Sequence, residues 1–111
     1  MTEDLTKLVC RDLPQGTPAL DAETVARLQE QLHRDWASEH GRLSRTFALK
    51  GYAPAHMLAN AAAFLAEREG HHPDISFGWG WCKVTWWTHS VGGLSMNDFI
   101  CAAKLDALVA G

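Results

Sequence analysis

Apolar side chains recur at helical spacing in three segments of the chain. In the first, from about Asp21 to Ala37, they follow one another at intervals of three, four and four residues: Val25, Leu28, Leu32 and Trp36. This spacing places them on one face of a helix, and Asp21 is suited to cap its N-terminus. The pattern therefore predicts a first helix over residues 21–37.

A second helix is predicted from about Pro54 to Gly70. Pro54 suits the first turn of a helix, where its missing N–H costs no hydrogen bond. The alanines at positions 61–63 have high helix propensity. Gly70 can adopt the positive φ that ends a helix. We therefore expect the helix to end just before His71.

Ser95 and Asp98 predict the start of a third helix, with Ser95 as N-cap and Asp98 at the third helical position, a variant of the capping box. Two apolar stripes follow. One contains Met96, Phe99, Ile100, Ala103 and Ala107, and the other contains Cys101, Leu105 and Leu108. Burial on two sides is expected, and we interpret one side as a subunit interface.

Between the helices the period changes to that of strands. Alternating positions in residues 42–50 predict one strand, with a short partner near Trp36–Ser38. Residues Ile75–Thr88, with a Gly/Trp-rich centre, predict a β-hairpin. The resulting order, with helices on one face of an antiparallel sheet, indicates an α+β fold.

Composition and charge narrow the possibilities. A chain of 111 residues with 47% hydrophobic side chains is a single globular domain. We expect an irregular arm over residues 1–19 and one domain over 20–111. The net charge of -3 and the scattered basic residues disfavour direct binding of nucleic acid.

Location is inferred from the cysteines and from missing signals. The three cysteines have no CxxC spacing, which favours a reducing compartment over a disulfide framework. The start of the chain has no apolar signal region, and no apolar run reaches membrane length. We expect a cytoplasmic protein with no contact to membranes.

Three histidines mark the candidate chemistry. His71, His72 and His89 lie in a window of 19 residues, and Glu67, Asp74 and Asp98 flank them. Imidazole exchanges protons near neutral pH, so positioned histidines can act as general acid and base.

Two other interpretations of the histidines remain open. They could be structural, or three of them could bind zinc. Adjacent His71 and His72 tend to point apart, which weakens the zinc hypothesis. Asp98 also has a purely structural explanation as a helix cap.

These residues and their spacing resemble the pterin-4a-carbinolamine dehydratase family. Five residues separate Pro73 from Trp79, nine separate Trp79 from His89, and eight separate His89 from Asp98. The matching motif contains Glu67, His71, His72, Pro73, Trp79, Thr88, His89, Gly93, Leu94, Ser95 and Asp98. The resemblance covers most of the chain, from about Leu20 to Leu108. Trp86 and Trp87 depart from it, because family members usually have aliphatic or small residues there.

The resemblance implies a four-stranded antiparallel sheet with three helices on one face, and a homodimer or homotetramer. It implies dehydration of 4a-hydroxytetrahydropterin to quinonoid dihydropterin, in recycling of the tetrahydrobiopterin cofactor of aromatic amino-acid hydroxylases, with no metal or organic cofactor.

The resemblance also implies roles for the motif residues. His71, His72 and His89 would be catalytic. Residues that bind or orient the pterin would be Glu67, Pro73, Trp79, Thr88 and Asp98. The alternative function is a non-enzymatic interaction module, since animal members also act as dimerisation cofactors of a homeodomain transcription factor. The resemblance therefore also implies a transcription-factor or hydroxylase partner.

Overall fold

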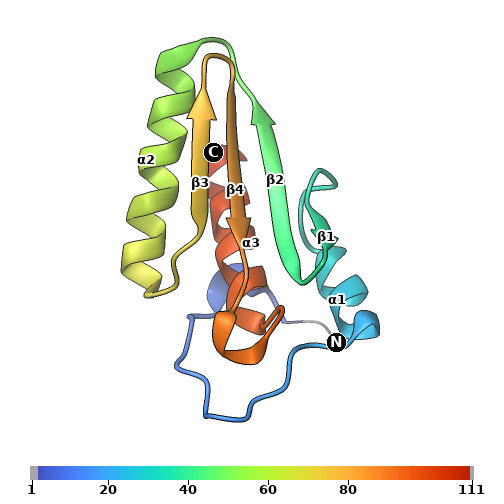
Figure 1. Ribbon diagram of the computed structural model, residues 1–111. Coiled ribbons are helices and arrows are strands. Elements are labelled where there is room, and N and C mark those ends of the chain that lie inside the picture. Colours follow the sequence, from blue (N-terminus) through green and yellow to red (C-terminus); the bar gives the residue numbers. More distant parts are fainter. Residues whose placement is uncertain (1–2, 111) are drawn as a thin grey trace.

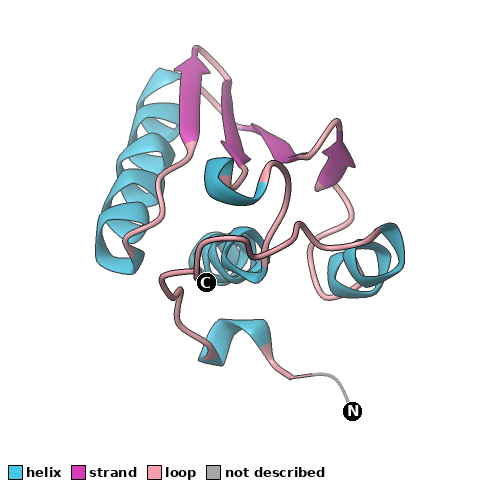
Figure 2. Cartoon of the chain, turned by 60° about the horizontal axis from the view of Figure 1, so that its bottom comes forward, coloured by secondary structure: helices cyan, strands magenta, loops and turns pink. Residues whose placement is uncertain are grey.

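Three α-helices cover one face of a four-stranded antiparallel sheet in the computed structural model, which describes residues 3–110 (Figures 1 and 2). The helices are α1 (Ala22–Gln29), α2 (Tyr52–Glu69) and α3 (Met96–Ala110). The strands are β1 (Ala37–Glu39), β2 (Arg42–Ala48), β3 (Asp74–Gly78) and β4 (Trp81–Trp86). Two short 3-10 helices are η1 (Leu5–Lys7) and η2 (His89–Val91). The predicted α+β fold is confirmed.

The sheet has the strand order β1-β2-β4-β3, and all neighbours are antiparallel. Side chains alternate between its two faces, as strand geometry requires. Leu43, Phe47, Cys82, Val84 and Trp86 point towards the helices and are buried. The predicted hairpin is confirmed, with Trp79 and Gly80 at its turn.

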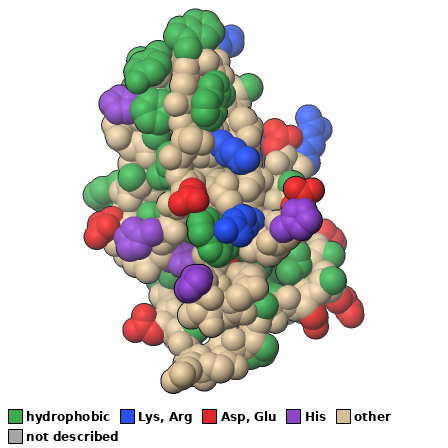
Figure 3. Space-filling model, in the orientation of Figure 1, with side chains coloured by type: hydrophobic (Ala, Val, Ile, Leu, Met, Phe, Trp, Pro, Cys, Tyr) green, Lys and Arg blue, Asp and Glu red, His purple; other side chains and the backbone are tan. Residues whose placement is uncertain are grey.

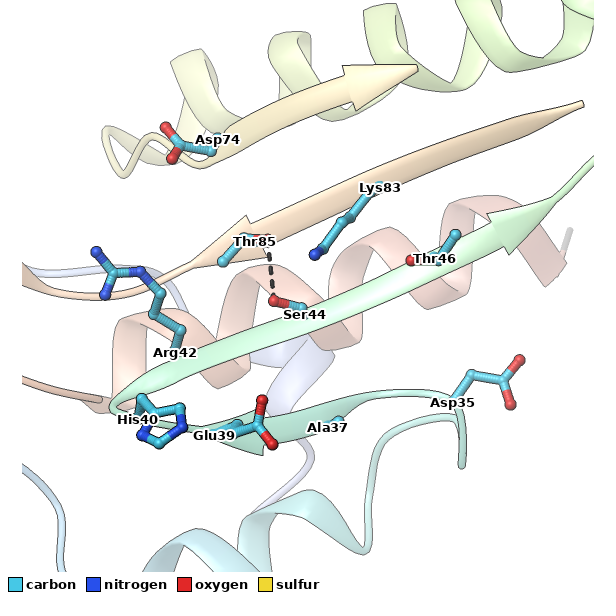
Figure 4. A pocket seen from close by; sticks show the side chains of 10 residues that line it. All are labelled: Asp35, Ala37, Glu39, His40, Arg42, Ser44, Thr46, Asp74, Lys83 and Thr85. Atoms are coloured by element: carbon cyan, nitrogen blue, oxygen red, sulfur yellow. Dashed lines mark hydrogen bonds between the residues drawn. The ribbon is translucent and has the colours of Figure 1, made fainter. Parts of the chain in front are cut away.

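The other face of the sheet is polar and is not covered by the helices. Figure 4 shows Ser44 and Thr46 of β2 beside Lys83 and Thr85 of β4 on this face. The Ser44 and Thr85 hydroxyls are hydrogen-bonded across the two strands at 2.9 Å. These residues line an open groove of about 700 Å³.

Helix α3 is buried on two sides by the chain itself. One side packs against the sheet and α2. The N-terminal segment, residues 3–19, contains η1 and packs on the other side. Leu5 of η1 is only 1% exposed. We expected one of these sides to be a subunit interface. The N-terminal segment covers the second side, so the two apolar stripes are explained within one chain. The subunit interface on this helix stays a prediction.

The first helix is shorter than predicted, since α1 ends at Gln29 instead of near Ala37. Beyond it, the backbone N–H of His33 donates to Asp106 Oδ2 on α3 at 2.9 Å. The N–H of Asp35 donates to the His33 ring at 3.0 Å. Leu32 and Trp36 are nevertheless buried. The spacing identified core residues correctly, but turns replace the last predicted helical turns, and the bond from His33 to Asp106 ties them to α3.

The ends of the other helices agree with the sequence. Pro54 lies in the first turn of α2, and Gly70 ends this helix with a φ of 69°. The short partner strand expected near residues 36–38 is β1. Within residues 3–110, we find no helix with the length and apolar character needed to span a membrane.

Candidate active site

His71 is directed inward by the way in which α2 ends. The N–H groups of Gly70 and His71 both donate to the carbonyl of Ala66, and the left-handed Gly70 reverses the chain. The His71 ring then meets the start of α3, where its Nε2 lies 2.6 Å from Asp98 Oδ1. The His71 side chain is 14% exposed and that of Asp98 is 0% exposed. The His71 imidazole is therefore hydrogen-bonded to a fully buried carboxylate.

The two oxygens of Asp98 have different partners. Oδ2 accepts hydrogen bonds from the backbone N–H of Ser95 at 2.9 Å and from the hydroxyl of Thr88 at 2.8 Å. Thr88 and Ser95 also bond each other at 2.7 Å. The capping role predicted for Asp98 is therefore observed in its bond to Ser95, and Oδ1 remains available for His71. A carboxylate with this many donors is held in one orientation.

The backbone of His71 has an anchor that the sequence did not reveal. The indole N–H of Trp86 donates to the His71 carbonyl at 3.1 Å. Trp86 is fully buried and packs on Trp36, with ring centroids 6.2 Å apart. This contact depends on the register of the hairpin against α2. The only signal in the sequence was an unusual tryptophan at this position.

His72 and Glu67 form a second, exposed pair. His72 Nε2 lies 3.1 Å from Glu67 Oε2, and the two side chains are 63% and 81% exposed. The sequence placed Glu67 one helical turn before His71, at the same edge. Because the chain reverses at Gly70, His71 contacts Asp98 instead, and Glu67 contacts His72. Pro73 is half-buried and leads from His72 into β3.

His89 reaches the same end of the sheet from β4. Thr88 is buried and pairs with Gly93, and the exposed His89 begins η2. Figure 3 shows histidine side chains gathered on this face, around the ends of α2 and β4. Among residues 3–110, the His89 ring has no hydrogen-bond partner. The structure thus brings His71, His72, His89, Glu67, Thr88 and Asp98 to one end of the sheet.

Trp79 does not join this group within one chain. It lies at the turn between β3 and β4 and is 75% exposed. His72 precedes the opposite end of β3. At about 3.3 Å per residue, the two are separated by roughly 20 Å. A contact between Trp79 and a ligand at the histidines would need a second copy of the chain.

The histidines do not form a set of metal ligands. Over the described residues, no group of three His, Cys, Asp or Glu side chains is arranged to hold a metal ion. The zinc hypothesis therefore has no ligand set to support it. What the arrangement offers is an imidazole fixed by a buried carboxylate, with two further imidazoles near it, and this is suited to proton transfer.

Comparison with known proteins gives a consistent result. Residues 18–108 match the family model described as pterin 4 alpha carbinolamine dehydratase. A protein of Nitrosomonas europaea is 45% identical over 105 residues, which are 95% of this chain and 93% of the relative. A protein of Legionella pneumophila is 39% identical over 111 residues, 98% of each chain. Both carry the provisional name pterin-4-alpha-carbinolamine dehydratase.

Two solved structures are similar as well. One is described as a transcriptional coactivator/pterin dehydratase from Brucella melitensis, with a TM-score of 0.76 and 27% identity. The match covers 84% of this chain and 99% of that one. The other is a pterin dehydratase-like protein described as a RuBisCO assembly factor in the alpha-carboxysome. Its TM-score is 0.60 at 28% identity, over 71% of this chain and 94% of that one.

Proposed function

Since this chain belongs to the pterin 4 alpha carbinolamine dehydratase family, we propose that it converts a 4a-hydroxytetrahydropterin to a quinonoid dihydropterin and water by histidine acid/base catalysis. The observation that carries this proposal is the His71 ring held at 2.6 Å by the buried Asp98. The product returns to the tetrahydrobiopterin pool that serves aromatic amino-acid hydroxylases.

The reaction needs two proton transfers. The 4a-hydroxyl leaves as water when its oxygen receives a proton, and a proton is withdrawn from a ring nitrogen of the pterin. We assign these transfers to His71 and His89 as a pair, without giving acid or base to either. Each positioned proton transfer is typically worth roughly 10²–10⁴-fold in rate.

We assign the substrate-facing atom of His71 from its contact with Asp98. A carboxylate only accepts hydrogen bonds, so Nε2–H of His71 donates to Asp98. Nδ1 then has the free lone pair and faces the substrate in this proposal. Asp98 and Thr88 are positioning residues, because they act through His71.

The exposed pair at the rim of the site binds the pterin in this proposal. His72 orients the pterin ring and shares in proton transfer. Glu67 holds the His72 imidazole, and Pro73 restricts the backbone of His72 to extended conformations. No metal ion or organic cofactor takes part.

The assay that tests this function is stopped-flow absorbance of 4a-hydroxytetrahydropterin dehydration. His71→Ala and His89→Ala are expected to lose most of the acceleration while staying folded, as judged by circular dichroism. His56→Ala is a matched control, because His56 is an exposed histidine in the first turns of α2, far from the site. A near-normal rate in either site variant would remove that residue from the mechanism.

A homo-oligomer is part of the proposal. Met57 and Phe64 on α2 and Trp79 at the hairpin are large apolar side chains that stay exposed in one chain. Burying such side chains against a second copy is favourable. Sedimentation velocity at micromolar concentration tests this, and a monomer there would contradict it. We also propose a cytoplasmic location, where the free cysteines Cys10, Cys82 and Cys101 persist as thiols.

The alternative function is an interaction module without catalysis. It is favoured by the similar structures described as a coactivator and as an assembly factor. A protein with this role alone would leave the spontaneous dehydration rate unchanged. The same assay therefore separates the two functions.

A further inference from the structure

Two of the three cysteines meet in the structure although 90 residues lie between them in the sequence. Cys10 Sγ lies 3.5 Å from Cys101 Sγ. Cys10 is in the N-terminal segment and is partly buried, whereas Cys101 is fully buried in α3. Cys82 is buried in β4 and is not part of the pair. The proposed dehydration uses none of these thiols.

The backbone around Cys10 is held in place from both sides. Its N–H donates to Glu69 Oε1 at the end of α2, at 3.0 Å. The next residue, Arg11, exchanges two hydrogen bonds with the side chain of Asn97 on α3, at 3.0 and 2.8 Å. Lys104 in turn bonds the other oxygen of Glu69 at 2.8 Å. The approach of the two sulfurs is therefore built by specific contacts of the N-terminal segment.

We propose that Cys10 and Cys101 form a modification site, which a peroxide converts into an intramolecular disulfide that ties the N-terminal segment to α3. The oxidant is hydrogen peroxide. The disulfide is reversible by thiols, as are other redox-responsive disulfides of reducing compartments. This inference does not depend on the dehydratase function.

The chemistry balances in two steps. The Cys10 thiolate attacks one peroxide oxygen, the O–O bond breaks, and Cys10 becomes a sulfenic acid while the other oxygen leaves as water after taking up a proton. The sulfur of Cys101 then attacks the Cys10 sulfur. The hydroxyl leaves with the Cys101 proton as a second water. Two thiols and one hydrogen peroxide thus give one disulfide and two waters.

The surroundings assign the order of these steps. Cys10 is partly buried, whereas Cys101 is fully buried, so Cys10 is the more accessible residue of the pair. The hydrogen bond with Cys10, together with burial, raises the pKa of the Cys101 thiol. Since the thiolate is the nucleophile that attacks a peroxide, Cys101 is not the thiol that reacts first. Bonding requires the sulfurs to approach by about 1.5 Å. Residues 8–14 have no regular secondary structure, so a shift of this size at Cys10 breaks no helix or sheet hydrogen bond.

The test uses the reduced full-length chain treated with hydrogen peroxide. Its intact mass is expected to fall by two hydrogen atoms, one of three thiols is expected to remain free, and a peptide map is expected to link Cys10 to Cys101. Dithiothreitol should reverse all three changes. Cys82→Ser should behave in the same way, since burial raises the pKa of Cys82 and it faces no other thiol. Cys10→Ser and Cys101→Ala should not lose the two hydrogens.

A second measurement is independent of whether the variants fold. The disulfide closes a long loop, so the oxidised wild-type chain should unfold at a higher temperature than the reduced chain, and dithiothreitol should abolish the increase. The proposal is overturned if peroxide only adds oxygen atoms to Cys10. It is also overturned if the linked peptide contains Cys82 or joins two chains.

Discussion

Asp98→Asn is the substitution that most sharply tests the role of the buried carboxylate. The two side chains have nearly the same shape, so the packing around residue 98 is retained. What changes is the hydrogen bonding. The N–H of Ser95 at 2.9 Å needs an acceptor, which fixes the amide oxygen of the variant at the Oδ2 position. The amide NH₂ group then points at His71 Nε2.

This arrangement reverses the tautomer of His71. In the wild-type chain Nε2–H donates to Asp98 at 2.6 Å. In the variant Nε2 must accept, so the proton moves to Nδ1, the atom that we assign to the substrate. A hydrogen bond to a charged group contributes about 1.5–3 kcal/mol, which corresponds to a loss of roughly 10- to 150-fold in kcat.

The assay is stopped-flow dehydration with kcat and KM determined separately, together with urea unfolding. Asp106→Asn is the matched control, because Asp106 also lies on α3 and accepts bonds from Trp36, Arg45 and His33 at 2.7–2.9 Å. It should lower stability and leave kcat unchanged. A kcat of Asp98→Asn within about twofold of wild type, or an equal loss in Asp106→Asn, would refute the reasoning, because twofold corresponds to less than half a kcal/mol.

Three further predictions concern the supports of the site and the core. Trp86→Phe removes the N–H that donates to the His71 carbonyl and should lower kcat several-fold. Trp36→Phe removes the hydrogen bond to Asp106 and should lower only the free energy of unfolding. Equal kcat values in the two variants would contradict this prediction. Leu5→Ala should cost about 2–5 kcal/mol of unfolding free energy in urea, and a loss below about 0.5 kcal/mol would show that the N-terminal segment is not part of the core. Burial raises the pKa of Glu69, but hydrogen bonds from Lys104 and Cys10 and the Lys104 charge lower it overall. The stability that the Glu69 carboxylate contributes is therefore present above the pKa of an unfolded glutamate and is lost as pH falls through the lower folded pKa. The difference in unfolding free energy between wild type and Glu69→Gln should accordingly shrink from about pH 5 downwards. A difference that stays constant with pH would contradict this prediction.

Local signals were sufficient for most of the elements. Gly70, Pro54 and the hairpin glycines act within one turn of the chain, so the bounds of α2, β3 and β4 could be predicted. The end of α1 could not, because it depends on a hydrogen bond from His33 to Asp106, far along the chain. The cover on α3 could not be predicted either. Residues 1–19 lack periodicity, yet Leu5 is a core residue.

The candidate site shows the same division. The spacing of the histidines and Asp98 along the sequence was enough to predict them as one group, because each lies at the end of a helix or strand. The individual pairs depend on the direction in which Gly70 turns the chain, which pairs His71 with Asp98 and His72 with Glu67. The roles of Trp86 and of the Cys10–Cys101 contact depend on register and long-range packing, which no local pattern encodes.

Metal-free catalysis by the histidines is tested by measuring the dehydration of 4a-hydroxytetrahydropterin by the wild-type chain in a stopped-flow instrument, with and without a chelator. We predict an acceleration over the spontaneous rate that the chelator leaves unchanged and that His71→Ala abolishes. A folded wild-type protein that gives no acceleration, or an acceleration that the chelator removes, would contradict metal-free catalysis by the histidines.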